Sequence, residues 1–179
     1  MTKDLKDLLN ILKQNQKFKE FSQKNPKPVP CAGFFVLDFK NSQEQYTLDY
    51  KVNDDIFSFK INPETNQVQM QQEEIMDKTK PLEEISLNIK LEISEIKDIV
   101  NKELEKNNIK NPIEKIICVL QSLSLGKDDL SGKPLGCHTI WNLTCMLSMF
   151  NIIMIHIDAL DGKVLKFEKK SLFDFVKKQ

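Results

Sequence analysis

The chain has 179 residues, enough for one ordinary domain or two small ones. Its 26 basic residues are all lysine, and 26 acidic residues balance them to a net charge of zero. Arginine is the usual residue for gripping phosphate and guanine, so its absence, in a chain with no basic block, argues against nucleic-acid binding.

The first half is predicted to be one helix followed by four antiparallel strands. Residues 4–23 carry leucines at spacings of three and four, the period of a helix, and Pro26, Pro28 and Pro30 should end it. Apolar and polar residues then alternate in four short segments separated by turn residues, which predicts a meander. These segments are residues 33–39, 46–52, 57–61 and 68–70.

The second half repeats this order. Residues 71–84 are polar and are interpreted as a linker, and strict alternation over 85–91 predicts an added strand. Ser94 is the expected N-cap of a second helix that ends near Asn107. Four more strands are predicted, at 113–120, 141–147, 153–157 and 164–167, with a long loop at 122–138 and a short closing helix at 171–177.

A sequence echo 96 residues apart supports the repetition. Residues 57–68 read FSFKINPETNQV and residues 153–164 read IMIHIDALDGKV, so that apolar positions and turn positions coincide. Asn66 falls on Gly162, and asparagine and glycine are the residues that best tolerate a left-handed backbone. Internal duplication of this kind predicts two similar structural units.

The second half also resembles a known family. The helix opening Ile93-Ser94-Glu95-Ile96, followed by strands and by the segment 157–164 (IDALDGKV), is similar to PepSY domains. The resemblance covers residues 92–169 and, more weakly, residues 4–75. It implies a cystatin-like unit, in which a curled antiparallel sheet packs on one helix, and a role in binding or restraining protein partners such as peptidases.

Together these observations predict an α+β protein of two tandem cystatin-like, PepSY-like units, each a helix packed on a curled antiparallel meander sheet. The first unit would span residues 1–76, the linker and added strand 77–91, and the second unit 92–179. The expected function is a non-catalytic module for protein or peptide binding or for assembly.

Cysteine and histidine offer two alternative kinds of site. Cys118, Cys137, His138 and Cys145 could supply the four ligands of a zinc ion. However, the chain has no Cys-x-x-Cys pair, and the patterns around Cys118 and Cys145 indicate burial, so no metal and no cofactor are expected. The rival function is a cysteine-dependent enzyme that uses the Cys137–His138 loop. Since neighbours on an extended chain point apart, its base would have to be His156 or a residue folded back from elsewhere.

The second set of strands is predicted to be apolar on both faces. In the first half, the face away from the core carries polar residues such as Thr47 and Lys60, whereas the corresponding face of the second half carries Met146. Such a face must be covered by something, so a contact is expected with the other unit, with a second copy or with another partner. The interface candidates are Ile152, Met154, Leu165 and Phe167.

The expected surroundings are those of the cytoplasm. The N-terminal sequence lacks the pattern of a secretory signal, and four cysteines in such a chain indicate free thiols in a reducing compartment. The most apolar stretch, residues 141–157, contains too many polar residues to cross a membrane, so no membrane span is expected.

Overall fold

The computed structural model describes residues 2–74, 82–124 and 137–171. Within these residues the chain forms three α-helices, one short 3-10 turn and eight strands. The predicted loop at 122–138 is described only at its ends, where residues 122–124 and 137–138 lie in strands, and the predicted closing helix lies outside the described residues except for Ser171, in the last strand.

The N-terminal helix is broken into two. Helix α1 is Leu5–Gln14 and helix α2 is Gln16–Lys24. Asn15 between them has an extended backbone, with φ of −72° and ψ of 135°, and its side chain accepts a hydrogen bond from the N–H of Lys17. Asparagine competes for backbone hydrogen bonds in this way, so the periodic pattern over residues 4–23 spans two helices and not one.

Strands β1 (Val29–Asp38), β2 (Glu44–Val52), β3 (Asp55–Asn62) and β4 (Gln67–Glu74) form the predicted meander. Residues 82–92 then cross to the second half without forming the strand predicted at 85–91. Their backbone hydrogen bonds go to the ends of other strands, since the N–H of Ile85 donates to Pro30 and that of Leu91 to Ala159. Alternation in this segment therefore reflects the burial of Ile85 and Leu91, not pairing within a sheet.

Helix α3 (Ile93–Lys106) opens the second half, with Glu92 as its N-cap in place of the predicted Ser94. Strands β5 (Ile113–Ser124), β6 (Cys137–Leu147), β7 (Asn151–Asp158) and β8 (Val164–Ser171) follow, and the 3-10 turn Ser148–Phe150 joins β6 to β7. Both segments of the sequence echo are strand, turn and strand. The left-handed turn position is confirmed in both, with φ of 53° at Asn66 and 76° at Gly162.

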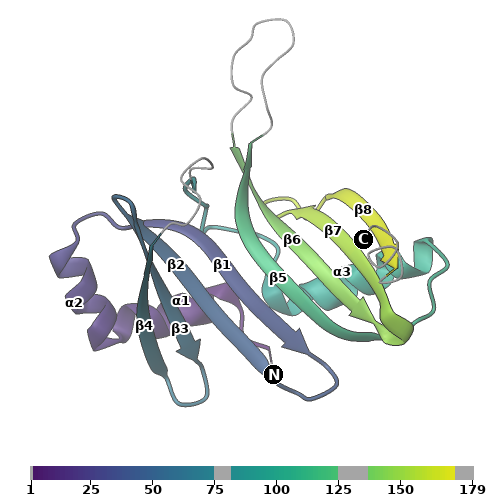
Figure 1. Cartoon of the computed structure of the whole chain (residues 1–179), viewed down its shortest axis with the longest axis horizontal. Helices are drawn as coiled ribbons and strands as arrows, with labels where there is room; N and C mark the ends of the chain where they lie inside the picture. The colour runs from purple at the N-terminus through teal and green to yellow at the C-terminus, as the bar shows by residue number, and fades with distance from the viewer. Residues whose placement is uncertain (1, 75–81, 125–136, 172–179) are drawn as a thin grey trace, which may run out of the picture.

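The prediction of two tandem units is wrong, because the eight described strands form one continuous antiparallel sheet. Its order is β4-β3-β2-β1-β5-β6-β7-β8, and β1 pairs with β5 from Gly33↔Leu120 to Asp38↔Lys115 (Figure 1). In two separate sheets β1 and β5 would each be an edge strand with a row of unpaired N–H and C=O groups. Pairing β1 with β5 satisfies both rows and merges the sheets.

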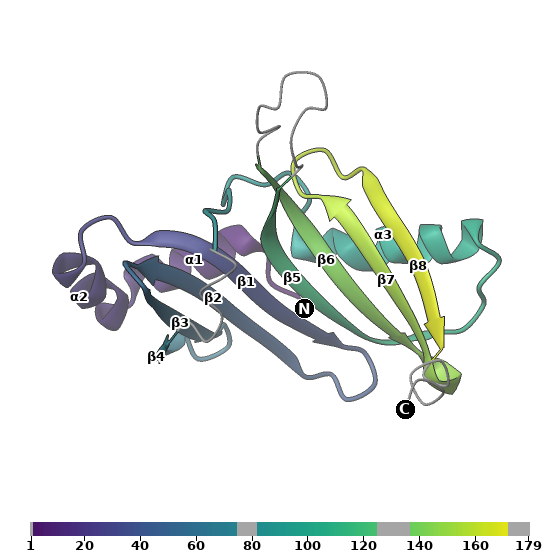
Figure 2. The same ribbon diagram turned by 45° about the horizontal axis from the view of Figure 1, so that its top comes forward.

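The three helices lie on the same side of this sheet. Figures 1 and 2 show α1 behind β1–β4, α2 continuing from it towards the β4 edge, and α3 behind β5–β8, while none of the described helices lies on the opposite face. We call these the helix face and the open face.

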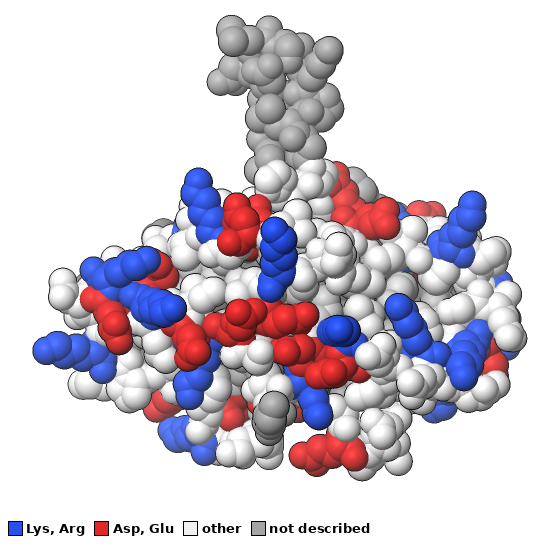
Figure 3. All heavy atoms as spheres, turned by 180° about the vertical axis from the view of Figure 1, so that it is seen from behind, with Lys and Arg blue, Asp and Glu red and all other residues white. Residues whose placement is uncertain are grey.

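The N-termini of α1 and α3 cap each other on the helix side. The N–H of Leu5 in α1 donates to Glu92 at 3.0 Å, and the N–H of Ser94 in α3 donates to Asp4, the N-cap of α1, at 3.1 Å. Carboxylates are favoured at helix N-termini, where free N–H groups point outward. Acidic side chains accordingly gather near the middle of this side in Figure 3.

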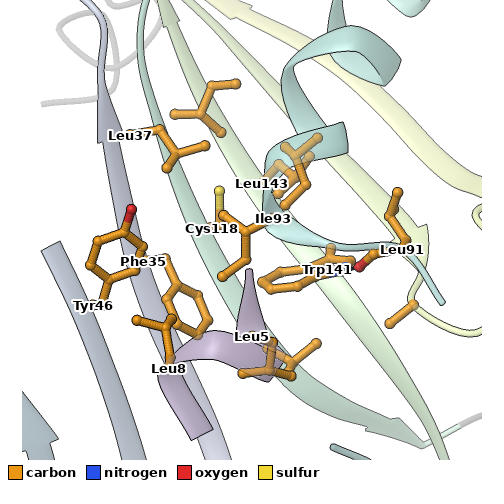
Figure 4. Close-up of a cluster of buried hydrophobic side chains, with 14 of the residues drawn as sticks. Leu5, Leu8, Phe35, Leu37, Tyr46, Leu91, Ile93, Cys118, Trp141 and Leu143 are labelled. Carbon is orange, nitrogen blue, oxygen red and sulfur yellow. Dashed lines mark hydrogen bonds between the residues drawn. The ribbon is translucent and has the colours of Figure 1, made fainter. Parts of the chain in front are cut away.

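One apolar core runs under the whole sheet. Phe35 of β1 and Trp141 of β6 are fully buried and pack edge to face with ring centroids 5.6 Å apart, and Leu5 and Leu8 of α1 and Cys118 of β5 belong to the same cluster (Figure 4). The core therefore crosses the β1–β5 seam, and neither half encloses a core of its own.

Candidate functional site

The open face of the sheet is apolar at its centre. Side chains alternate between the two faces of a strand, so residues next to buried core positions point to the open face. On the four adjacent strands β1, β5, β6 and β7, apolar residues occupy many of these positions, with the polar Asn142, Thr144 and His156 among them. We group as the open-face patch the apolar residues Phe34, Val36, Ile117, Val119, Met146, Ile152 and Met154.

Strand register places these side chains next to one another. Phe34 lies opposite Val119 and Val36 opposite Ile117, across the β1–β5 seam. Further along the sheet, Met146 lies opposite Ile152. Thr144 lies between Ile117 and Met154, so the two parts of the patch meet across a threonine. Directly opposed residues have Cβ atoms about 4.5–5.5 Å apart, so the patch is one surface.

Two residues of the patch remain substantially exposed, Phe34 at 39% and Met146 at 37%. The other five are half-buried by their neighbours on the sheet. Contiguous apolar surfaces are typical of interaction sites when they are large, so this patch is the candidate site on the sheet.

Charged residues of both signs border the patch in ion pairs. Lys115 pairs with Asp38 at 3.1 Å at one end, and Glu168 of β8 pairs with Lys166 at 3.0 Å and with Lys170 at 3.5 Å along one side. The hydrogen bond from Lys166 lowers the pKa of Glu168 below its usual value. Hydrogen bonds from Asn41, outweighing partial burial, likewise lower the pKa of Asp38. The border therefore stays ionised without a large net charge at neutral pH.

The structure divides the four predicted interface residues. Ile152 and Met154 belong to the open-face patch, and Leu165 is 44% exposed on the edge strand β8. Phe167 lies opposite the fully buried Ile155 and packs against the core, so it points to the helix face. A register shift between His156 and Ile157 separates the two ends of β8, and the sequence pattern gave no sign of it.

The β1 and β5 members of the patch were missed by the sequence analysis. Phe34 and Val36 belong to a strand that the sequence placed in the polar-faced first half. Their significance depends on the pairing of β1 with β5, which joins them to Ile117 and Val119. Apolar residues on both faces of β1 and β5 were the available signal, since such runs are typical of strands at the centre of a sheet.

Cys137 and His138 point to opposite faces at the start of β6. The thiol of Cys137 donates to Glu83, and this hydrogen bond raises the pKa of Cys137. His138 lies on the other face, where its Nδ1 is 2.8 Å from a carboxylate oxygen of Asp158. A cysteine nucleophile paired with histidine needs a lowered pKa and the imidazole within reach, whereas here the pKa of Cys137 is raised and His138 lies on the other face.

Asp158 holds a turn as well as the histidine. Its Oδ1 accepts the N–H groups of Leu160 at 2.8 Å and Asp161 at 3.3 Å. Burial alone would raise the pKa of Asp158, but these hydrogen bonds and the contact with His138 outweigh it, so that the pKa lies below its usual value. His156, the other candidate base, is partly buried on the open face, and burial followed by the charge of Lys166 lowers its pKa.

The four candidate zinc ligands do not converge. Cys118 and Cys145 are fully buried in the core, where burial raises the pKa of Cys145 to about 12 and that of Cys118 well above its usual value. Cys137 and His138 lie at the end of the sheet on opposite faces. Across the described residues, no three His, Cys, Asp or Glu side chains come together as a possible metal site.

A polar groove of about 860 Å³ lies between the β1–β2 turn and the β3–β4 turn, in the first half of the sheet. Tyr46 stands in it, donates to Glu44 and accepts the N–H of Lys3 at 3.0 Å. Burial, followed by the hydrogen bond to Glu44, raises the pKa of Tyr46, so the phenol is neutral. Charges of both signs line the groove, and this mixture favours no particular class of ligand.

Comparison with known proteins adds the fold and little more. No family model matches the chain, and no curated protein matches it. A solved structure from Clostridium difficile 630, described as a "putative lipoprotein", is similar with a TM-score of 0.55 and 17% identity, over 89% of this chain and 97% of that one. At this identity the likeness extends to the fold alone. None of the helices in the described ranges has the length and hydropathy needed to cross a membrane.

Proposed function

We propose that this protein is a non-catalytic binding or assembly module that holds a protein partner on the open face of its sheet. One observation carries the proposal: all three described helices cover one face, and the opposite face has an apolar centre with Phe34 and Met146 exposed. Burying such side chains contributes about 1.5–3 kcal/mol each. A partner that covers the patch would therefore gain substantial affinity from it.

Two further points support this role over the rival enzyme. Cys137 and His138 are held on opposite faces, and the Cys137 thiol has a raised pKa. The resemblance of residues 92–169 to PepSY domains stays a prediction and agrees with a binding role. We keep a reducing, cytoplasmic location as part of the proposal, because the four cysteines of the chain are free thiols.

The test is differential capture from the source cell. Immobilised wild-type protein is compared with Phe34→Lys and Met154→Lys, which place charges in the patch, and with Leu160→Lys. Leu160 is 40% exposed in the β7–β8 turn, so it matches Phe34 in exposure and lies beyond the ends of the strands. Circular dichroism confirms that each variant is folded.

We expect a specific partner to be retained by the wild type and by Leu160→Lys, and to be lost at least tenfold with either patch variant, because a charge buried at an apolar interface is left unpaired. The proposal would be contradicted if all four immobilised proteins retained the same partners. It would also be contradicted if none of them retained more protein than an empty matrix.

A further inference from the structure

The two edges of the sheet are protected unequally. An edge strand presents unpaired N–H and C=O groups, and proteins usually guard it with lysine, proline or an irregular register. Strand β8 has such protection: Lys166, Lys169 and Lys170 lie along it, and the register shift between His156 and Ile157 interrupts its pairing.

Strand β4, at the opposite edge, has no lysine, no proline and no register shift, and its charges, Glu73 and Glu74, lie at its C-terminal end. It pairs with β3 from Asp55↔Glu74 to Asn62↔Gln67 without a shift. Residues 67–72 (QVQMQQ) contain no charge and no proline, and apart from Val68 their side chains are exposed. Met70, in the middle, is 45% exposed. A regular, neutral edge with an apolar centre is suited to accept another strand.

We propose that β4 pairs antiparallel with β4 of a second copy of this chain, with Met70 opposite Met70 on a two-fold axis perpendicular to the sheet. Residues that face each other across such an axis must have side chains on the same face of the sheet. A register centred on Met70 meets this condition, because it pairs odd-numbered residues with odd-numbered ones and even with even. It places Gln69 opposite Gln71 and Val68 opposite Gln72. Residues 68–72 then each face a neutral residue, Gln67 faces Glu73 at the ends of the pairing, and the glutamines at 69 and 71 can exchange amide hydrogen bonds.

This self-complementarity identifies the occupant as a second copy. The same operation centred on Lys166, Glu168 or Lys169 of β8 would place lysine opposite lysine, so the charge pattern favours β4 over β8. The dimer would contain one continuous sheet, with the helices of both copies on one side and both open faces on the other. Its existence does not depend on the proposed function of the open face, and either could fail without the other.

The first experiment measures molecular mass in solution by analytical ultracentrifugation over a range of micromolar concentrations. We expect the wild type to reach twice the mass of the 20.8-kDa chain. Met70→Lys should weaken the dimer at least about tenfold, because the axis places the two introduced charges together. Leu165→Lys is the matched control, since Leu165 is 44% exposed on the other edge strand, and it should leave the dimer unchanged.

The second experiment tests the register by disulfide cross-linking. The exposed Cys137 is first removed with Cys137→Ser, which leaves only buried cysteines. Added Met70→Cys should then give a cross-linked dimer under mild oxidation, whereas added Gln67→Cys, away from the axis, should not. A monomer at all concentrations, a dimer insensitive to Met70→Lys, a dimer broken by Leu165→Lys or by Phe34→Lys, or equal cross-linking at both positions would each overturn the proposal.

Discussion

At the scale of single residues, the two copies of the sequence echo solve the same turn with different side chains. Asn62 accepts hydrogen bonds from Glu64 and Thr65, and Asp158 does the same for Leu160 and Asp161. The left-handed position is filled by an asparagine in one turn and by Gly162 in the other. The two turns therefore share a left-handed backbone conformation at this position, and not the residue that adopts it.

Gly162 allows this demand to be measured. A Cβ at this position would meet nothing within 4 Å, so a substitution changes only the cost of the backbone conformation. We expect Gly162→Ala to lower the free energy of unfolding by about 1–2 kcal/mol. Gly162→Asn should cost clearly less, because Asn66 adopts the same conformation. Urea denaturation of both variants tests this, and equal losses would contradict it.

Gly33 is required for a different reason. It lies on β1 at the seam with β5, and an added Cβ would approach the ring of Phe35 to 2.6 Å. Phe35 is fully buried against Trp141, so the ring has little room to move. Gly33→Ala should destabilise the protein by about 1–3 kcal/mol, the usual cost of overpacking. Ala32→Gly, at the half-buried neighbouring position, is the control for changes on the same strand. If Gly33→Ala left the free energy of unfolding unchanged, the Phe35 ring would have to move aside without cost, which would contradict the prediction.

At the scale of elements, local periodicity was sufficient for most strands. Alternation over Tyr46–Val52 and the apolar run over 113–120 both correspond to observed strands, β2 and β5. The same reasoning failed over 85–91, where alternating burial arises in a crossing segment. It also placed the N-cap of α3 at Ser94, because a box made from Glu92 and Glu95 lacks the usual serine or threonine signature.

Pairing between elements could not be predicted in the same way. Periodicity indicates which face of a strand is apolar, but it does not indicate which other strand pairs with it. Gly33 and Leu120, for example, are paired across β1 and β5 although nothing in the local sequence links them. The candidate site inherits this limit. Ile152 and Met154 were assigned to the open face from local alternation, whereas Phe34 and Val119 become part of one patch only through the seam.

The mutual capping of α1 and α3 predicts a pH effect at Glu92. Burial, reinforced by Asp4 and Glu95, raises the pKa of Glu92 above 4.5 in the folded protein. The folded state therefore binds more protons than the unfolded state between the two pKa values, and the contribution of Glu92 to stability declines as pH rises through that window.

Glu92→Gln should remove this decline. Its carboxamide oxygen can still accept the N–H of Leu5, but it carries no charge to be buried beside Asp4. Measured by urea denaturation from pH 4 to pH 8, the stability of the variant relative to the wild type should increase as pH rises. Glu105→Gln, an exposed change on the same helix, controls for net charge. If the stability of Glu92→Gln relative to the wild type decreased as pH rises, the charged form of Glu92 would be stabilising in the folded protein, contrary to the prediction.

At the scale of the whole molecule, the seam joins the two halves of the sheet over one core, and we expect them to unfold cooperatively. Core residues from α1, β1, β5 and β6 contact one another beneath the seam, and Trp141 donates its indole N–H to the carbonyl of Leu91 in the crossing segment at 2.9 Å. Removing contacts on one side should therefore destabilise the other. The protein has a single tryptophan, in β6, so its fluorescence reports on the second half and on its contact with Phe35 across the seam.

Leu48→Ala tests this coupling, because Leu48 lies in β2 and is only 1% exposed. The cavity should lower the free energy of unfolding by about 2–5 kcal/mol. If the sheet unfolds as a unit, the urea midpoint seen by Trp141 fluorescence should fall together with the midpoint seen by circular dichroism. Thr47→Ala, which changes the neighbouring open-face residue, should leave both midpoints nearly unchanged. A Trp141 transition that keeps its wild-type midpoint in Leu48→Ala would mean that the second half is stable by itself, with the β1–β5 pairing joining two independent structures.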